Sequence, residues 1–143
     1  MSDPYRLQRF LDAQESVWQT ALSELKEGRK RTHWIWFVFP QMRGLGLSPT
    51  SEFYGVASLD EARAYLAHPV LKMRLLTCTE AALAHEGLSA NAIFGSPDDL
   101  KLRSCLTLFD AASEAEDNPY HVALSRFFGG VPDPRTLELL GLV

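Results

Sequence analysis

The sequence has little cysteine, no extended apolar stretch and no excess of basic charge, and each shortage excludes a class of protein. Its 143 residues include only two cysteines, Cys78 and Cys105, too few for the disulfide framework of a small secreted domain. Both lie in apolar, helix-like surroundings, which predicts buried thiols. No stretch approaches the length of a membrane span, and no apolar signal region opens the chain. These features predict a cytoplasmic protein that does not associate with membranes.

The chain also lacks the basic surface that broad nucleic-acid binding requires. Its formal net charge is −4, whereas proteins that bind nucleic acids displace counterions with clustered lysine and arginine. The one basic run covers residues 26–31 and contains Glu27 and Gly28, which is typical of a solvated helix end. We therefore do not expect nucleic acid among the partners.

Complete catalytic signatures are missing as well. The sequence has no phosphate-binding glycine loop with its lysine, no dinucleotide fingerprint, no zincin helix and no nucleophile elbow. Its histidines are not spaced as a metal pair on one helical turn. The sequence therefore predicts no metal site and no cofactor, and it leaves open whether the protein is an enzyme.

What the sequence does contain is a strong helical pattern. Apolar residues make up 46% of the chain and no linker or repeat divides it, so we expect one domain over residues 1–143. Apolar residues recur at helical spacing from Tyr5 to Lys26, which predicts one helix that starts at Asp3-Pro4 and ends at Gly28. Capping and proline signals predict further helices over about 59–67, 70–85, 97–115, 118–127 and from 134 onward.

One further segment has an ambiguous pattern. Residues 32–41 (THWIWFVFPQ) are aromatic and β-branched, and such a run forms either a buried strand or a buried helix. Propensity favours a strand, but the chain offers no second convincing strand to pair with it. We therefore expect a buried helix that ends near Pro40, with the strand as the alternative. The whole pattern predicts an all-α bundle of about six or seven helices.

The same segment carries the first candidate site. On a helix, His33, Trp36 and Gln41 would share one side. Ligand pockets are mostly apolar with a few polar anchors, and the segment has this composition. Trp34 and Trp36 are therefore candidate pocket walls, and His33 and Gln41 are candidate anchors. The alternative is that the histidine and the glutamine only tie the loop of residues 43–51 onto the core.

Two further groups of polar residues supply candidates. His68 precedes a proline at a helix break, and Arg74 lies in an apolar helix, where it either extends to solvent or binds an anionic ligand. Lys101 and Asp98 form either an ordinary surface pair or a polar patch that faces a cleft. Since histidine titrates near neutral pH, any proton transfer is assigned to His33 or His68. The candidate ligand-binding residues are Trp34, Trp36, Gln41, Ser48, Arg74 and Lys101.

Several motifs follow one another along nearly the whole chain. They are LxRFxxAQ at 7–14, ALxELxxGxK at 21–30, HWxWFxFPQ at 33–41, GLGxS at 44–48, AYLxHPxL at 64–71 and PDDxKL at 97–102. In this order they resemble an uncharacterised bacterial family, some members of which are labelled calpastatin-like. The resemblance implies a mainly helical fold and no assigned catalytic residues. Lys72 departs from it, because glycine is expected there.

The calpastatin-like label implies nothing about function for this chain. Calpain inhibitors of that name are disordered repeat proteins, whereas this sequence has the composition of a folded domain and contains no repeats. The resemblance therefore supports the fold and leaves the activity open.

Two hypotheses about function follow from the residues. In the first, a pocket lined by the His33–Gln41 segment binds a small anionic, nucleotide-derived ligand of the ADP-ribose or NAD kind, since aromatic rings stack on bases and cations hold phosphates. In the second, the protein is an interaction or homodimerising module without catalytic activity. Its contact would be formed by Phe127, Phe128 and the apolar tail over 137–143, unless that tail packs on its own core.

Overall fold

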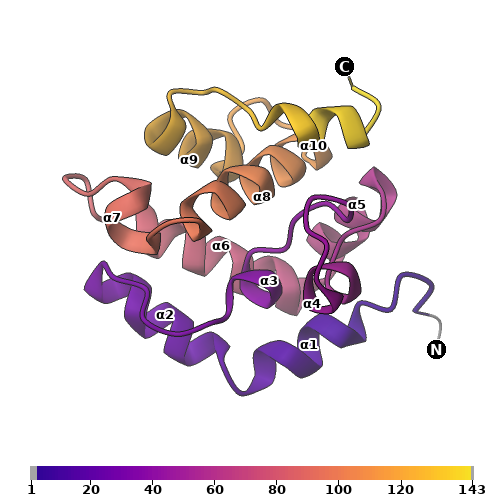
Figure 1. Cartoon of the computed structure of the whole chain (residues 1–143), viewed down its shortest axis with the longest axis horizontal. Coiled ribbons are helices and arrows are strands. Elements are labelled where there is room, and N and C mark those ends of the chain that lie inside the picture. The colour runs from indigo at the N-terminus through magenta and orange to yellow at the C-terminus, as the bar shows by residue number, and fades with distance from the viewer. Residues whose placement is uncertain (1–2, 143) are drawn as a thin grey trace.

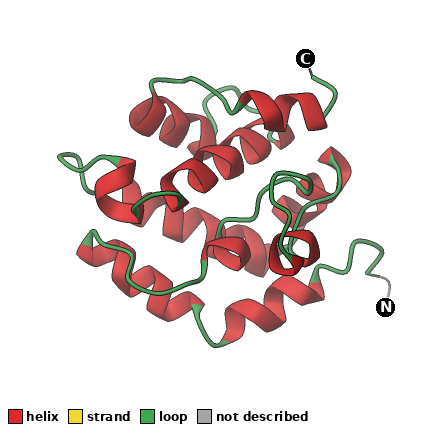
Figure 2. Ribbon diagram, in the orientation of Figure 1, coloured by secondary structure: helices red, strands yellow, loops and turns green. Residues whose placement is uncertain are grey.

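The computed structural model describes residues 3–142, and its helices surround one apolar core (Figure 1). Over those residues it contains ten helices, no strand and one isolated β-bridge. Figure 2 shows the helices and the loops that join them. The all-α class is thereby confirmed, and the expected number of six or seven helices is too low. The difference arises because the first predicted helix is two helices and because two short helices lie in segments where the sequence pattern predicts none.

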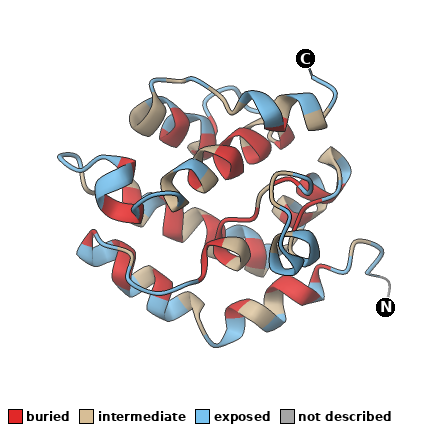
Figure 3. Cartoon of the chain, in the orientation of Figure 1, coloured by how far each residue is buried: buried red, intermediate tan, exposed pale blue. Residues whose placement is uncertain are grey.

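The order of the helices places the first two and the last two on opposite sides of the core (Figure 1). The helices are α1 (Gln8–Glu15), α2 (Trp18–Glu27), α3 (Ile35–Val38), α4 (Pro49–Phe53), α5 (Leu59–Ala67), α6 (Pro69–Leu83), α7 (Ala90–Phe94), α8 (Asp98–Ala112), α9 (Pro119–Phe128) and α10 (Pro134–Leu139). In Figure 1, α1 and α2 form a shallow V along one side, while α8, α9 and α10 lie along the other. Helix α6 packs against both α2 and α9, and the buried residues face this interior (Figure 3).

Local capping signals explain where most helices begin. Ser58 accepts a hydrogen bond from the backbone N–H of Glu61, and α5 covers the predicted residues. His68 caps α6, Asn118 caps α9 and Asp133 caps α10, each through a side-chain atom that accepts backbone N–H groups. In each of α6, α9 and α10 a proline occupies the first turn, where its missing N–H costs nothing.

The prediction of one helix from Tyr5 to Lys26 is wrong, because the helix is interrupted. Helix α1 ends at Glu15 and α2 starts at Trp18, with Val17 between them at a φ of −125°. The break lets α1 pack against α3 while α2 packs against α6. Helix α2 ends as predicted at Gly28, whose φ of +85° is left-handed and suits glycine.

The aromatic segment forms the short helix α3, so the prediction of a buried helix is confirmed in type, although it ends earlier than Pro40. Trp34 is 1% exposed and Phe39 is fully buried. The Phe39 ring packs edge-on against Phe94 of α7, with 5.6 Å between the ring centroids. The segment therefore belongs to the core along most of its length.

A single parallel β-bridge between Met42 and Val56 closes the loop that follows this segment. The backbone N–H of Val56 donates to the Gln41 carbonyl at 2.9 Å, and the N–H of Arg43 donates to the Val56 carbonyl at 2.7 Å. Helix α4, capped by Ser48, lies inside this loop. The bridge therefore fixes the path of the backbone on both sides of Met42.

Both cysteines are free and buried, which confirms the predicted thiols. Burial raises the pKa of Cys78 to about 12 and that of Cys105 well above its ordinary value. Among the helices formed by residues 3–142, none combines the length and the hydropathy that crossing a bilayer requires.

A buried ion pair joins α1 to α5. The Arg9 Nη2 atom lies 2.7 Å from Glu61 Oε2, and the two side chains are only 6% and 4% exposed. Arg9 also donates to the carbonyls of Phe53 and Gly55, and Glu61 accepts the N–H of Ala57. These bonds hold the end of the α4 loop against α1, and they compensate for the removal of both charges from water.

Replacing Glu61 with glutamine tests this arrangement. The variant keeps the size of the side chain but leaves the Arg9 charge buried without its counterion, so we expect the free energy of unfolding in urea to fall by about 3 kcal/mol. The control is Asp60→Asn on the same helix, because Asp60 is 74% exposed and its pair with Arg63 is long, at 3.7 Å. We expect the control to change stability by less than about 0.5 kcal/mol. Similar small losses in both variants would contradict the interpretation.

Candidate functional site

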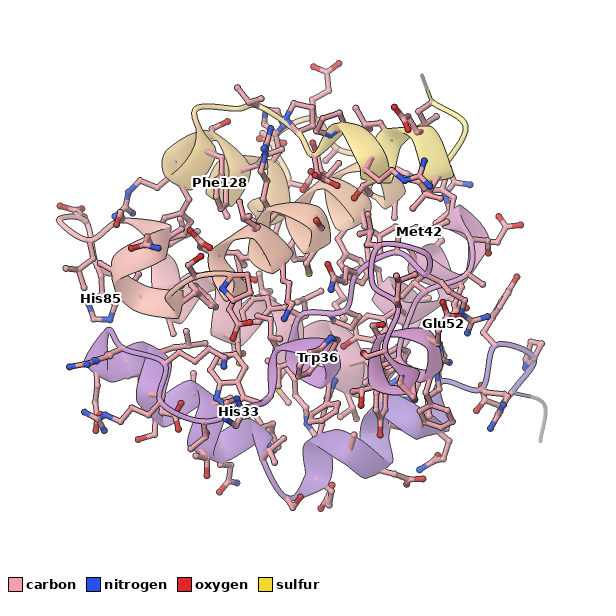
Figure 4. All side chains as sticks on the ribbon, viewed as in Figure 1. His33, Trp36, Met42, Glu52, His85 and Phe128 are labelled. Atoms are coloured by element: carbon pink, nitrogen blue, oxygen red, sulfur yellow. The ribbon has the colours of Figure 1, made fainter. Side chains whose placement is uncertain are left out.

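A cavity of about 380 Å³ lies between the loop that follows α3 and the start of α8. Its wall combines an aromatic ring, apolar side chains, hydroxyl groups, one amide, one ammonium and one carboxylate, a mixture typical of pockets that bind small molecules. The residues that line it are Trp36, Gln41, Leu45, Gly46, Leu47, Ser48, Ser51, Pro97, Leu100, Lys101, Ser104 and Asp133. Trp36, labelled in Figure 4, projects from α3. We call this the α3–α8 cavity.

Lys101 is the cation of this cavity, and two neighbours hold it in place. Its Nζ atom lies 4.4 Å from the centroid of the Trp36 ring and 3.2 Å from Asp98 Oδ1. Asp98 also binds Lys30, at 2.7 Å from its Nζ atom. Burial acts to raise the pKa of the Asp98 carboxyl, but the bonds and charges of Lys30 and Lys101 outweigh burial and keep the pKa below its ordinary value. The carboxylate therefore stays ionised and positions the ammonium.

Two polar groups on the wall have capacity for further hydrogen bonds. The backbone of Gln41 is held by the β-bridge, while no protein group within residues 3–142 bonds to its half-buried side-chain amide. Asp133 uses its Oδ2 atom to accept the N–H and the hydroxyl of Thr136, at 3.0 and 2.6 Å. Its Oδ1 atom has no partner among the same residues. An amide and a carboxylate oxygen are therefore available to a bound molecule.

Glycine at position 46 lets the loop pass close to the start of α4. A Cβ atom there would lie 2.7 Å from the Ser51 Oγ atom and 2.8 Å from its Cβ atom, closer than real contacts allow. The next residue, Leu47, is 96% exposed and forms part of the rim. The loop thus brings an apolar side chain and the Ser48 and Ser51 hydroxyls to the same opening.

Four of the predicted ligand-binding residues, Trp36, Gln41, Ser48 and Lys101, line this cavity. Trp34 does not, because it is buried and its indole N–H donates to Glu24 at 3.0 Å.

Arg74 also lies elsewhere, on the side of α6 that faces α1 and α2. Its guanidinium carbon is 5.0 Å from the centroid of the Trp18 ring, and its Nη2 atom is 3.5 Å from the Glu15 carboxylate. Its Nε atom is buried without a partner in the described chain. The ligand-binding roles of Trp34 and Arg74 stay predictions.

The two histidines predicted to transfer protons do not line the α3–α8 cavity either. His33 is exposed in the loop between α2 and α3 (Figure 4). The Nδ1 atom of His68 accepts the N–H of Val70 at 3.3 Å, and its side chain lines a separate groove beside Tyr5. The structure therefore places His33, His68 and Arg74 at three different locations, and the catalytic roles stay predictions.

Sequence reasoning missed Asp133, whose motif indicates only a helix start. The residue reaches the wall because the Arg103 side chain donates to the carbonyls of Val131 and Pro132, at 2.9 and 2.7 Å. The N–H of Asp133 then donates to the Thr107 hydroxyl. These contacts join segments far apart in sequence, so no local signal could have revealed them.

A buried carboxylate organises the segment behind the Trp36 wall. Glu24 accepts hydrogen bonds from the N–H of Arg31, from the N–H and hydroxyl of Thr32, and from the Trp34 indole, at 2.7 to 3.1 Å. Burial acts to raise the pKa of Glu24, but these bonds outweigh burial and lower the pKa to about 2. The carboxylate therefore fixes the path of the chain into α3.

Within residues 3–142, no three His, Cys, Asp or Glu side chains gather closely enough to hold a metal ion. The fold and the cavity define a small all-helical protein with a mixed apolar and polar pocket. The chain belongs to the family described as "Protein of unknown function (DUF1810)", whose model matches residues 4–140. This confirms the expected membership of an uncharacterised family, but neither the family description nor the relative described next supports the calpastatin-like label.

A solved structure is closely similar to this chain. It is the crystal structure of the conserved hypothetical protein Rv1873 from Mycobacterium tuberculosis, with 48% sequence identity and a TM-score of 0.94. The match covers 99% of this chain and 100% of the other. No curated protein matches the chain.

The Glu24 network predicts a pH dependence of stability. Because the folded-state pKa is about 2 and the ordinary value is 4.5, the stabilisation is complete well above pH 4.5 and is lost as the pH falls toward 2. At pH 7 we expect Glu24→Gln to lower the free energy of unfolding by about 3 kcal/mol. The difference from wild type should shrink by more than half by about pH 3.

Urea unfolding at a series of pH values measures this difference. Glu27→Gln is the matched control, since Glu27 lies one turn further along α2 and is 49% exposed. Its effect should be small at every pH. A Glu24→Gln difference that is the same at pH 6 and pH 3 would show that the carboxylate charge contributes nothing to stability.

Proposed function

We propose that the α3–α8 cavity binds a small anionic, nucleotide-derived ligand, of which ADP-ribose and NAD are the natural probes. The observation that carries the proposal is the position of Lys101, held at 4.4 Å from the Trp36 ring on the wall of a cavity that also exposes a free amide. A cation beside an aromatic ring can bind a ligand that contains both a negatively charged group and a planar group.

The ammonium of Lys101 supplies the anion-binding function. Lysine has three N–H donors, and the bond to Asp98 uses one of them. Hydrogen bonds from an ammonium to a phosphate are stronger than those between neutral groups. A phosphate group of the ligand would therefore bind favourably beside the Lys101 ammonium.

The remaining wall suits a base and a sugar. Trp36 and Leu100 offer aromatic and apolar surface, and stacking of a base on an aromatic ring contributes about 1–3 kcal/mol. The free Oδ1 atom of Asp133 can accept hydrogen bonds from ribose hydroxyls, and the Gln41 amide can both donate and accept. The proposal concerns binding, since neither candidate histidine lies on this wall.

The packing of the C-terminal region favours this proposal over an interaction module. Phe127, Phe128, Leu139 and Leu140 pack against the core of their own chain. Leu142 is 54% exposed, and Val143 lies outside the described residues. A homodimer through this tail stays a prediction, which sedimentation of the purified protein tests.

Titration of the protein with ADP-ribose and with NAD by isothermal calorimetry tests the proposed function. Lys101→Met removes the ammonium and keeps an apolar stem of similar length. We expect it to weaken binding about tenfold or more, because a charged hydrogen bond to the ligand is lost. We expect the midpoint of thermal unfolding without ligand to stay nearly unchanged.

Lys72→Met is the matched control, since Lys72 is an exposed lysine on α6 that does not line the cavity. It should bind as wild type does. The proposal is refuted if neither ADP-ribose nor NAD binds at millimolar concentration. It is also refuted if Lys101→Met and wild type bind with equal affinity.

A further inference from the structure

A second concavity, of about 310 Å³, lies around the end of α4 and contains an unusual concentration of positive charge. Three arginines line it, Arg6, Arg9 and Arg43, together with the ring of Phe53. We infer that this concavity, the Arg6–Arg43 site, binds the phosphoryl group of a small phosphate ester. The site shares no lining residue with the α3–α8 cavity, so the inference does not depend on the proposed function.

Arg9 does not supply the free charge of this site. Its guanidinium is neutralised by Glu61 at 2.7 Å, and its remaining N–H groups donate to backbone carbonyls, including those of Tyr5 and Phe53. The net positive charge therefore comes from Arg6 and Arg43.

The Arg6 guanidinium has no hydrogen bond and no ion pair within residues 3–142. Its central carbon lies 5.7 Å from the centroid of the Phe53 ring. Asp3 and Asp12 line a neighbouring concavity with Arg6, but within residues 3–142 neither forms an ion pair with it: Asp3 accepts the N–H groups of Leu7 and Gln8, and Asp12 accepts the Gln8 side-chain amide. Arg6 is thus a cation with free donors.

The backbone of Arg43 is anchored, and its exposed side chain keeps donors free. Its backbone is part of the β-bridge, and its Nε atom donates to the Glu52 carbonyl at 3.1 Å. Gly55 packs directly on it, since a Cβ atom at position 55 would lie 2.7 Å from the Arg43 Cα atom. The two terminal nitrogens of the guanidinium have no protein partner in the described chain. Two arginines with unused donors therefore share one concavity.

The backbone of Arg6 supports a role beyond packing. Its φ of 55° makes it the one non-glycine residue with a positive φ among residues 3–142. Residues other than glycine, asparagine and aspartate rarely adopt this left-handed conformation, and such strain persists mainly where function requires it. Glycine at this position would relieve the strain and remove the guanidinium at the same time.

The chemistry of the two guanidiniums selects the ligand class. Guanidinium groups bind phosphate through paired N–H donors, and two of them match the double charge of a phosphate ester better than the single charge of a carboxylate. The exposed half of the Phe53 ring offers apolar contact for the organic part of the ester. The net charge of −4 disfavours a long polyanion, so a small molecule is the appropriate ligand.

A nuclear magnetic resonance titration at constant ionic strength tests this site. The probes are inorganic phosphate and phenyl phosphate, with benzoate as the singly charged comparison. We expect saturable shifts of the backbone amides of Tyr5, Arg6 and Ala57, with phenyl phosphate binding tighter than benzoate. Because the second pKa of a phosphate ester is about 6, its binding should weaken as the pH falls below about 6.

Arg6→Gly is the decisive variant, because glycine suits the left-handed backbone and we therefore expect the fold to be kept. We expect it, and Arg43→Gln, to weaken phenyl phosphate binding about tenfold each. Arg31→Gln makes the same change in net charge at an arginine that is 60% exposed and does not line this concavity, and it should bind as wild type.

Three results would overturn the inference: shifts that do not saturate, affinity of Arg6→Gly equal to that of wild type, or equal losses in Arg6→Gly and Arg31→Gln. The second result would show that Arg6 takes no part in binding, and the third would show that phosphate meets only the general surface charge. Binding of ADP-ribose to the α3–α8 cavity should be unaffected by Arg6→Gly, which separates the two sites.

Discussion

The structure depends on two buried carboxylates that fix the chain between α2 and α5. Glu24 holds the entry to the aromatic segment through hydrogen bonds to Arg31, Thr32 and Trp34. Glu61, paired with Arg9, holds the other end near Gly55. Both carboxylates are almost inaccessible, so each is stable only with all its partners in place.

This constraint explains why two candidate sites arise from one short stretch of chain. Gln41 and Arg43 flank the bridged residue Met42, and they line different concavities. Ser51, in the middle of α4, lines the α3–α8 cavity, whereas Phe53, at the end of α4, lines the Arg6–Arg43 site. The fixed backbone on the two sides of the bridge therefore positions side chains in two concavities that differ in charge. One is nearly neutral and mixed in polarity, and the other is cationic.

Part of the α3–α8 cavity could be predicted from sequence. Trp36, Gln41, Ser48 and Lys101 were identified from residue type and from their place next to a glycine-containing loop or a helix start. The assumption that residues 33–41 form one helical face placed His33 with them, but α3 covers only Ile35–Val38. Outside that single turn the 3.6-residue spacing has no meaning, and His33 is exposed.

By itself the sequence determined the helical class, the starts at Ser58, Asn118 and Asp133, the break at His68-Pro69 and the stop at Gly28, because capping, proline geometry and periodicity act over a few residues. Only the tertiary structure decided the break before Trp18, the approach of Asp133 to the cavity and the convergence of Arg6 with Arg43. Each of these results from contacts between segments distant along the chain. Their free energy depends on packing in three dimensions, which no local pattern encodes.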